Sequence, residues 1–281
     1  MNRQVYLDLE KLPSHLRLSE KKIKNLIQAK IKEIRLYFKK WNFKKAVVGV
    51  SGGIDSSLSA CLVQRALKPQ NVILVTIPYF GISEKKDIEN IKTLAKNLKI
   101  PKKNFFIIPI NKPCDASWQI LKKIKGGDKK IRFGNIIARE RAKVLFDIAS
   151  AKKAIVVGAE NKTEERLAYF TLGGDHLSGV EPILNLYKSQ VYQLALFFKE
   201  IPEVILKKAP SAELWKGQTD EGELGISYLK LDTIISAYED LKLKPSQISK
   251  KFKIPKKEVE KVIKMLEKAK GKRFLPYILK A

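Results

Sequence analysis

The sequence has little cysteine, little histidine and no long apolar run, and each scarcity excludes a class of protein. The only cysteines, Cys61 and Cys114, are far apart and lack a metal-ligand spacing pattern, so we expect neither a disulfide framework nor a zinc site. No stretch approaches the roughly 18 consecutive apolar residues that a membrane-spanning helix needs. The first residues, MNRQVYLDLEKLPSH, lack the apolar core of a signal peptide. We therefore expect a cytoplasmic protein with no membrane partner.

Acidic residues are also scarce relative to basic ones. The chain has 29 Asp and Glu against 56 Lys and Arg, a formal net charge of +27. Such an excess favours nucleic-acid binding, because Lys and Arg neutralise phosphates. Here the lysine pairs are spread along the whole chain, and no arginine–aromatic stripe gathers them. We interpret the basic composition as solvated helix faces and expect small anionic substrates rather than a nucleic-acid partner.

Short apolar runs rich in β-branched residues alternate with helical patterns over most of the chain. The expected strands are 46–50, 71–79, 105–110 and 154–161. The expected helices around them are 19–41, 55–67, 84–99, 135–150 and 188–200. This alternation is typical of a parallel sheet covered on both faces.

From about residue 226 the pattern indicates helices only. The expected helices are 228–241, 246–252 and 256–269. We therefore predict one α/β domain over residues 1–281, with a Rossmann-like parallel sheet that has helices on both faces. The domain begins with a helical N-terminal segment (1–43), continues with an ATP-binding core (44–225) and ends with a helical C-terminal segment (226–281).

The most informative segment is AVVGVSGGIDSS, residues 46–57. A strand ends, two glycines permit a tight turn, and a helix begins. Backbone N–H groups at such a turn and the positive end of the helix dipole bind anions. Ser51, Ser56 and Ser57 add hydroxyl donors, and Asp55 fits a phosphate site if Mg²⁺ bridges it to phosphate oxygens. The segment predicts a phosphate-binding loop.

Two other motifs compete for this loop. A Walker A loop, GxxxxGK[ST], would need a lysine that is absent here. GVSGG, residues 49–53, matches the G-x-S-x-G nucleophile elbow of α/β-hydrolases in a strand–turn–helix context. In that interpretation Ser51 is a nucleophile and His176 its base. The interpretation requires that the folded chain bring these two side chains within hydrogen-bond distance.

SGGIDSS resembles the pyrophosphate-binding loop of the adenine nucleotide α-hydrolase-like ligases, which cleave ATP between the α and β phosphates. Five further segments resemble ammonia-dependent NAD synthetases in order and spacing over about residues 20–275. They are PYFGISEKKDIENIKTLAKNL (78–98), FGNIIARERAKVL (133–145), GAENKTEERLAYFTLGGDH (158–176), VEPILNLYKSQVYQLA (180–195) and KKAPSAELWKGQTDEGELGISYLKLD (207–232). The stretch PSAELWKGQTDEGELGISY is specific on its own.

The resemblance implies a ligase that forms NAD from deamido-NAD, ATP and ammonia through an adenylated carboxylate, releasing AMP and pyrophosphate. It implies Asp175 and Lys188 as catalytic residues, with Asp175 close to the nicotinate carboxylate and the ammonia. It implies that ATP is bound by Gly49, Ser51, Gly52, Gly53, Ile54, Asp55, Ser56, Ser57, Lys188 and Ser211. It implies that deamido-NAD is bound by Asn135, Arg139 and Asp175, and that Mg²⁺ is bound by Asp55 and Glu164.

The family binds deamido-NAD across a dimer interface, so the resemblance also implies a homodimer. We expect helices 19–41 and 135–150 among the contacting elements, because the apolar stripe of residues 23–41 is long for a helix covering a small sheet. Glutamine-dependent relatives carry an amidohydrolase domain, for which this chain is too short. We therefore expect free ammonia as the nitrogen source.

The sequence departs from the family pattern at a few positions. Ala159 stands where the family often has threonine, Thr163 where it has serine, and Ala168 where glycine is common. Ile131 lies where relatives present an aromatic residue to the nicotinate ring. Two other functions remain open: a relative that adenylates a tRNA base during thiolation, and an adenine-nucleotide-binding regulatory protein.

Overall fold

The computed structural model describes residues 4–273 and has a parallel sheet of four strands in the order β3-β2-β1-β4. The strands are β1 Lys45–Gly49, β2 Val72–Thr76, β3 Phe105–Ile107 and β4 Ala154–Val157. The two central strands come first in the sequence, so the chain winds outward from the middle in both directions. The predicted Rossmann-like sheet is confirmed.

The strands are shorter than predicted, and proline explains two of the differences. β2 ends at Thr76, two residues before Pro78, and β3 ends at Ile107, two residues before Pro109. Proline has no backbone N–H to donate to a sheet ladder. The apolar run that continues beyond each strand therefore belongs to a loop, and our predicted bounds 71–79 and 105–110 are wrong at their carboxyl ends.

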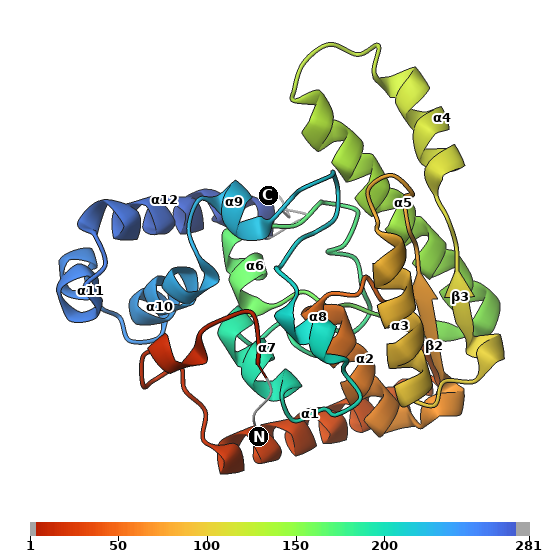
Figure 1. The fold of residues 1–281 in the computed structure, drawn as a ribbon, viewed down its shortest axis with the longest axis horizontal. Helices are drawn as coiled ribbons and strands as arrows, with labels where there is room; N and C mark the ends of the chain where they lie inside the picture. Colours follow the sequence, from red (N-terminus) through yellow and green to blue (C-terminus); the bar gives the residue numbers. More distant parts are fainter. Residues whose placement is uncertain (1–3, 274–281) are drawn as a thin grey trace, which may run out of the picture.

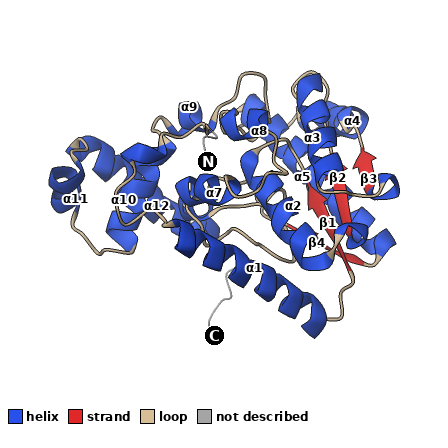
Figure 2. Ribbon diagram, turned by 60° about the horizontal axis from the view of Figure 1, so that its bottom comes forward, coloured by secondary structure: helices blue, strands red, loops and turns tan. Residues whose placement is uncertain are grey.

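Helices surround the sheet and extend beyond it on one side (Figures 1 and 2). Their bounds are α1 Glu20–Lys40, α2 Ile54–Leu67, α3 Lys85–Asn97, α4 Asn111–Leu121, α5 Lys129–Lys152, α6 Lys162–Leu167, α7 Lys188–Ala195, α8 Glu203–Lys207, α9 Asp220–Leu224, α10 Tyr228–Glu239, α11 Pro245–Phe252 and α12 Lys256–Arg273. Three short 3₁₀ turns cover Leu9–Lys11, Pro69–Asn71 and Lys102–Asn104.

Strand side chains alternate between two apolar clusters. Val48 and Leu74 belong to the larger cluster, which contains buried residues of α1, α2, α3, α7 and the C-terminal helices. Val47 and Ile73, their neighbours in the chain, belong to the smaller cluster with α4 and α5. Because successive side chains of a strand point to opposite faces, this alternation places helices on both faces of the sheet.

Helix α1 begins where predicted, because the Ser19 side chain accepts a hydrogen bond from the N–H of Lys22. Its apolar stripe is buried within the chain: Ile23, Ile31 and Phe38 all belong to the larger cluster. The stripe therefore gives no support to the predicted contact of this helix with a second subunit, which stays a prediction.

Several helices differ from the sequence prediction. Helices α4, α6, α8 and α9 were not predicted, and three of them have only five or six residues, too few for an apolar period. Helix α5 begins at Lys129, six residues before the predicted start, because the Asp128 side chain caps it. Helix α7 ends at Ala195, not at residue 200. No helix among residues 4–273 is long and apolar enough to cross a membrane.

The C-terminal helices α10, α11 and α12 lie together on the side of the molecule opposite the sheet, as Figure 1 shows in blue. They continue the larger cluster, to which Leu231, Ile235 and Val262 contribute fully buried side chains. The helical C-terminal segment predicted from residue 226 is confirmed over its described part. It packs on α6 and α7, which carry functional side chains.

Candidate active site

A cavity of about 260 Å³ opens at the carboxyl edge of the sheet. It is lined by the ends of β1, β2 and β4, the N-terminal turn of α2, and residues 208–214. In open parallel α/β sheets, ligands bind outside the carboxyl ends of the strands, where the strand order reverses. Here that point lies between β1 and β4, beside the predicted phosphate-binding loop.

The phosphate-binding loop is organised by its own hydroxyl groups. The Ser56 hydroxyl lies 3.2 Å from the backbone nitrogen of Ser51 and 3.3 Å from the Ser51 hydroxyl. Gly52 has φ of +82°, a conformation that side chains other than glycine rarely adopt. Gly53 caps α2 without any side-chain bond, which leaves N–H groups of the first helical turn for an anion.

Most residues predicted to bind ATP line this cavity. Of the residues predicted to bind ATP, those that line the cavity are Gly49, Ser51, Gly53, Ile54, Asp55, Ser56, Lys188 and Ser211. Gly52 and Ser57 do not belong to the lining. Ser57 is fully buried, and its hydroxyl donates to the Gly53 carbonyl at 2.8 Å. In this structure it therefore stabilises the loop and does not face the cavity.

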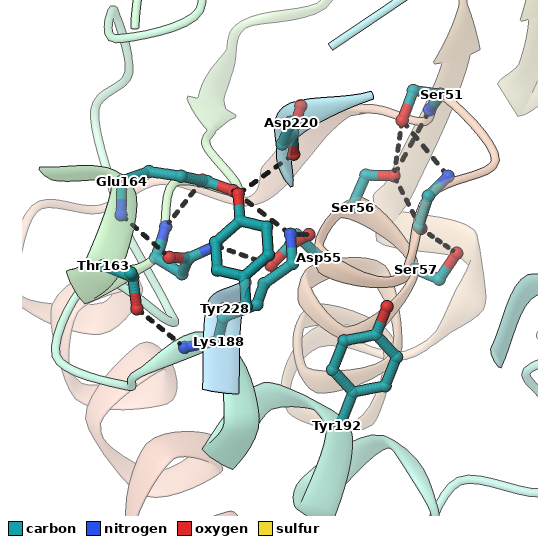
Figure 3. A network of polar contacts seen from close by, with 12 residues as sticks. Ser51, Asp55, Ser56, Ser57, Thr163, Glu164, Lys188, Tyr192, Asp220 and Tyr228 are labelled. Carbon is teal, nitrogen blue, oxygen red and sulfur yellow. Dashed lines mark hydrogen bonds and ion pairs between the residues drawn. The ribbon is translucent and has the colours of Figure 1, made fainter. Parts of the chain in front are cut away.

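Lys188 is the centre of the polar network in Figure 3. Its side chain is 2 % exposed, and its ammonium lies 2.5 Å from Asp55 Oδ2 and 3.1 Å from Glu164 Oε1. Burial alone lowers the pKa of Lys188, but the nearby carboxylates outweigh burial and raise it well above its ordinary value. Lys188 is therefore a fixed positive charge beside the phosphate-binding loop.

Asn161 links the two carboxylates that hold Lys188. Its side-chain nitrogen donates to Asp55 Oδ1 at 3.0 Å, and its side-chain oxygen caps α6 at the N–H of Glu164. Glu164 in turn accepts a bond from the Asn161 N–H, which completes a capping box. Burial raises the pKa of Glu164, and Lys188 opposes that rise. The capping box thus fixes the Glu164 carboxylate toward Lys188.

The C-terminal half adds two site residues that we did not predict, Asp220 and Tyr228. The Tyr228 hydroxyl donates to Asp220 Oδ2 at 3.0 Å and lies 3.3 Å from Glu164 Oε1. The ammonium of Lys188 lies 4.9 Å from the centre of the Tyr228 ring, a cation–π distance. Both residues belong to the stretch QTDEGELGISY, so the sequence signal was present, but it did not say which side chains face the site.

Arg141 holds residues 208–214 over the cavity. It donates to the carbonyls of Ala212 and Glu213, and to that of Ile77 beyond the end of β2. Lys208 adds an ion pair to Asp87 of α3 at 2.8 Å. These bonds place Ser211 at the cavity wall. Arg141 lies in the segment 133–145 that carried the family resemblance, but nothing in its spacing set it apart from Arg139.

Asp175 also lines the cavity, and its side chain is exposed to it. The Thr171 N–H donates to Asp175 Oδ1 at 2.8 Å and orients the carboxylate. The surrounding protein replaces bulk water and so raises the pKa of Asp175 above its ordinary value. Ala159, where the family often has threonine, lines the same cavity.

Asn135 and Arg139 lie outside this cavity. They line a second hollow of about 310 Å³ between α4 and α5, together with Trp118 and Arg132. Both are tied to the loop before Asp175: Asn135 accepts from the Thr171 hydroxyl at 2.8 Å, and Arg139 donates to the Leu172 carbonyl at 3.1 Å.

The α/β-hydrolase interpretation is wrong. The Ser51 hydroxyl contacts Ser56 and the N–H of Gly53. His176 instead lies 2.9 Å from Glu160 and stacks on Phe170, with ring centres 4.1 Å apart. A serine nucleophile needs its base within hydrogen-bond reach, and this chain holds the two residues with different partners.

The fold and this site define a parallel α/β protein with a glycine–serine loop at the carboxyl edge of its sheet and a lysine buried between carboxylates beside it. The profile of the NAD synthase family matches residues 26–276. The chain belongs to the NAD synthase family.

The curated relatives found have one name in common. An NH(3)-dependent NAD(+) synthetase of Pyrococcus horikoshii is 41% identical over 230 residues, which cover 82% of this chain and 86% of that protein. The enzyme of the same name from Fusobacterium nucleatum is 38% identical, covering 88% and 92%. These relatives extend over nearly the same length as this chain.

Solved structures agree with this family. The structure of NMN synthetase from Francisella tularensis has a TM-score of 0.79 at 28% identity and covers 94% of this chain and 99% of its own. An NH3-dependent NAD synthetase from Campylobacter jejuni has a TM-score of 0.70 at 29% identity, covering 92% and 99%.

Proposed function

We propose that this chain makes NAD from deamido-NAD, ATP and ammonia through an adenylated carboxylate, and releases AMP and pyrophosphate. The observation that supports this most is the position of Lys188, a buried cation held at 2.5 Å from Asp55 beside the phosphate-binding loop. Attack of a carboxylate on the α-phosphorus concentrates negative charge on phosphate oxygens. A preorganised lysine and backbone N–H groups stabilise that charge most where water is excluded.

The ATP phosphates would lie along residues 51–56. The N–H groups of the first turn of α2 and the hydroxyls of Ser51 and Ser56 face this end of the cavity. Ser211 also lines this cavity, on the segment that Arg141 holds in place. ATP would therefore bind between the loop and residues 208–214, with Lys188 at the phosphates rather than at the base.

Asp55 and Glu164 carry carboxylates, the type of ligand that a magnesium site needs. Both direct a carboxylate oxygen to one point, which the Lys188 ammonium occupies at 2.5 and 3.1 Å. Mg²⁺ prefers oxygen ligands and keeps several waters and phosphate oxygens of its substrate, so two protein carboxylates suffice. Over residues 4–273 no group of three or more metal-binding side chains is preformed. When bound, Mg²⁺ would neutralise phosphate charge, together with the positive charge of Lys188.

Asp175 is the residue that we assign to ammonia. Ammonium is the dominant species at neutral pH, and it must lose a proton before its nitrogen can attack. The Asp175 carboxylate is exposed to the cavity, attracts the cation and accepts its proton. Its raised pKa makes it a stronger base than an ordinary aspartate. The amidation step would take place at this end of the cavity.

Asn135 and Arg139 would bind deamido-NAD at a homodimer interface. They line a hollow beside the hairpin of α4 and α5, which projects from the body of the molecule in Figure 1. This hairpin carries exposed apolar side chains: Ile120 is 70% exposed and Ile124 is 60% exposed. Exposed apolar residues grouped in this way are typical of a protein–protein interface. A second copy covering the hairpin would bring the nicotinate end of the substrate toward Asp175.

The test is incubation of the purified chain with ATP, Mg²⁺, ammonium and deamido-NAD, followed by quantitation of all nucleotides. NAD, AMP and pyrophosphate should appear in equal amounts. ADP and phosphate in place of AMP and pyrophosphate would contradict the proposal. Since one solved relative is an NMN synthetase, a parallel reaction offers nicotinic acid mononucleotide. Faster amidation of the mononucleotide would transfer the proposal to that substrate.

A further inference from the structure

Asp232 is a fully buried carboxylate that has no part in the reaction described above. It lies on α10, in the helical C-terminal segment, and its side chain is 0% exposed. Its Oδ1 accepts from the Thr163 hydroxyl at 2.6 Å, and its Oδ2 accepts from the Ser189 N–H at 2.7 Å. A buried carboxylate is costly unless it is well hydrogen-bonded, so this arrangement calls for an explanation.

Asp232 caps helix α7, although it belongs to another helix, α10. Helix α7 begins at Lys188, and the residue before it, Tyr187, offers no side-chain cap bond. The Asp232 carboxylate meets the Ser189 N–H instead, at the positive end of the α7 dipole. Burial raises the pKa of Asp232 to about 6, and the bonds from Thr163 and Ser189 oppose that rise. At neutral pH the side chain is a charged cap at the helix turn that carries Lys188.

Thr163 extends the same connection to two chain segments. Its hydroxyl donates to Asp232 and accepts from the backbone N–H of Lys188 at 3.0 Å. Thr163 directly precedes Glu164, whose carboxylate lies 3.1 Å from the Lys188 ammonium. A single hydroxyl, visible beside Lys188 in Figure 3, therefore joins the start of α6 to the start of α7. The Glu164–Lys188 separation is set by this bond as well as by the ion pair.

We propose that Thr163 and Asp232 are positioning residues for the reaction. They hold the Lys188 ammonium and the Glu164 carboxylate in the positions from which these groups act on the ATP phosphates. The C-terminal helical segment is then part of the catalytic machinery, although it contributes no group to the phosphates themselves. This inference rests on the proposed function of Lys188. It predicts an effect on turnover rather than on binding of the nicotinate end of the substrate.

The test uses Thr163→Val, which keeps the shape of the side chain and removes the hydroxyl. The change removes two buried hydrogen bonds, one donated to Asp232 and one accepted from the Lys188 N–H. We expect kcat to fall at least about tenfold, with the KM for deamido-NAD unchanged. Thr163→Ser restores the hydroxyl and should recover turnover relative to Thr163→Val. The matched control is Thr233→Val on α10, next to Asp232; the Thr233 hydroxyl donates to the Leu229 carbonyl at 2.7 Å. That control should lower thermal stability without lowering kcat.

A double-mutant cycle separates positioning from general destabilisation. If Thr163 acts through Lys188, Thr163→Val should cost little further activity in a Lys188→Met background. A full additional loss in that background would contradict the inference, as would equal defects in Thr163→Val and Thr163→Ser. A wild-type chain that makes no NAD in the same series would overturn the proposed function instead.

A readout independent of turnover completes the test. A crystal structure of Thr163→Val should show the Lys188 ammonium displaced from the point between Asp55 and Glu164. An unchanged Lys188 position in a folded variant would overturn the role of Thr163, whatever reaction the wild-type chain catalyses.

Discussion

The Lys188 ammonium lies 2.5 Å from a carboxylate oxygen of Asp55, although 133 positions separate the two residues in the sequence. Asp55 belongs to the first turn of α2, and Lys188 is the first residue of α7. The fold therefore delivers a negative and a positive charge to one point beside a loop that is built to bind anions. A substrate phosphate that binds there must exchange with this ion pair, and this exchange underlies the first prediction.

Asp55→Asn and Glu164→Gln should each lower kcat/KM for ATP by about 100-fold, the usual scale for residues that hold a metal or its ligands. The combined loss should be smaller than the product of the two, because both side chains hold the same cation. Steady-state kinetics over a range of Mg²⁺ concentrations measure this. Multiplicative losses, or an unchanged Mg²⁺ requirement in either variant, would remove that residue from the shared site.

Asp175→Asn should lower amidation more than it lowers ATP cleavage. The variant keeps the shape of the side chain but loses the charge that attracts ammonium and accepts its proton. We expect less than one NAD per AMP released, because water then hydrolyses the adenylated intermediate. Asp147→Asn, a change at an exposed acid on α5 away from the cavity lining, is the matched control. A wild-type ratio in Asp175→Asn at all ammonium concentrations would show that the assignment is wrong.

Glu160→Gln should flatten the dependence of stability on pH. Burial raises the pKa of Glu160 from 4.5 to about 9. Between these values the folded chain keeps a proton that the unfolded chain releases, so rising pH favours unfolding. The wild type should lose up to about 1.4 kcal/mol of unfolding free energy per pH unit relative to the variant. Gln retains the shape needed to contact His176 at 2.9 Å.

Urea denaturation at pH 5, 6, 7 and 8 measures this difference between Glu160→Gln and the wild type. The same change at Glu33, an exposed acid on α1, should leave the pH profile unaltered. Parallel profiles for wild type and Glu160→Gln would mean that Glu160 is ionised in the folded chain at neutral pH.

Much of the fold followed from period-2 and period-3.6 patterns, because these report which side chains are buried. The strands with continuous apolar runs and the long helices α1, α2 and α3 were predicted within a few residues. The bounds that failed depend on local chemistry: Pro78 and Pro109 end strands early, and Asp128 starts α5 early. Hydrophobic patterns carry no signal for such caps and breaks.

The site was predictable only where a motif carries its own mechanism. The loop of residues 51–56 predicted phosphate binding from glycines, serines and a helix start, and the structure brings these residues together at the cavity. Lys188 was one lysine among many until the family resemblance singled it out. Asp232 and Thr163 gave no signal, because their importance lies in a contact between residues 69 positions apart.

The hairpin of α4 and α5 should form the subunit interface. Ile124→Asp places a charge on an apolar side chain that is 60% exposed, and it should convert a homodimer to monomers in light scattering at micromolar concentration. Leu36→Asp makes the same change at an exposed position of α1 and should leave the dimer intact. Dissociation by Leu36→Asp, and not by Ile124→Asp, would place the interface on α1. A monomeric wild type would contradict the homodimer altogether.

The most direct test of the central claim follows oxygen from the substrate carboxylate. Deamido-NAD labelled with ¹⁸O in both carboxylate oxygens is converted with ATP, Mg²⁺ and ammonium, and the products are analysed by mass spectrometry. Attack of the carboxylate on the α-phosphorus forms a carbon–oxygen–phosphorus link, and ammonia then breaks its carbon–oxygen bond. One ¹⁸O should therefore appear in AMP, one should remain in the amide of NAD, and pyrophosphate should carry none. Label in inorganic phosphate, or unlabelled AMP alongside labelled NAD, would contradict an adenylated intermediate.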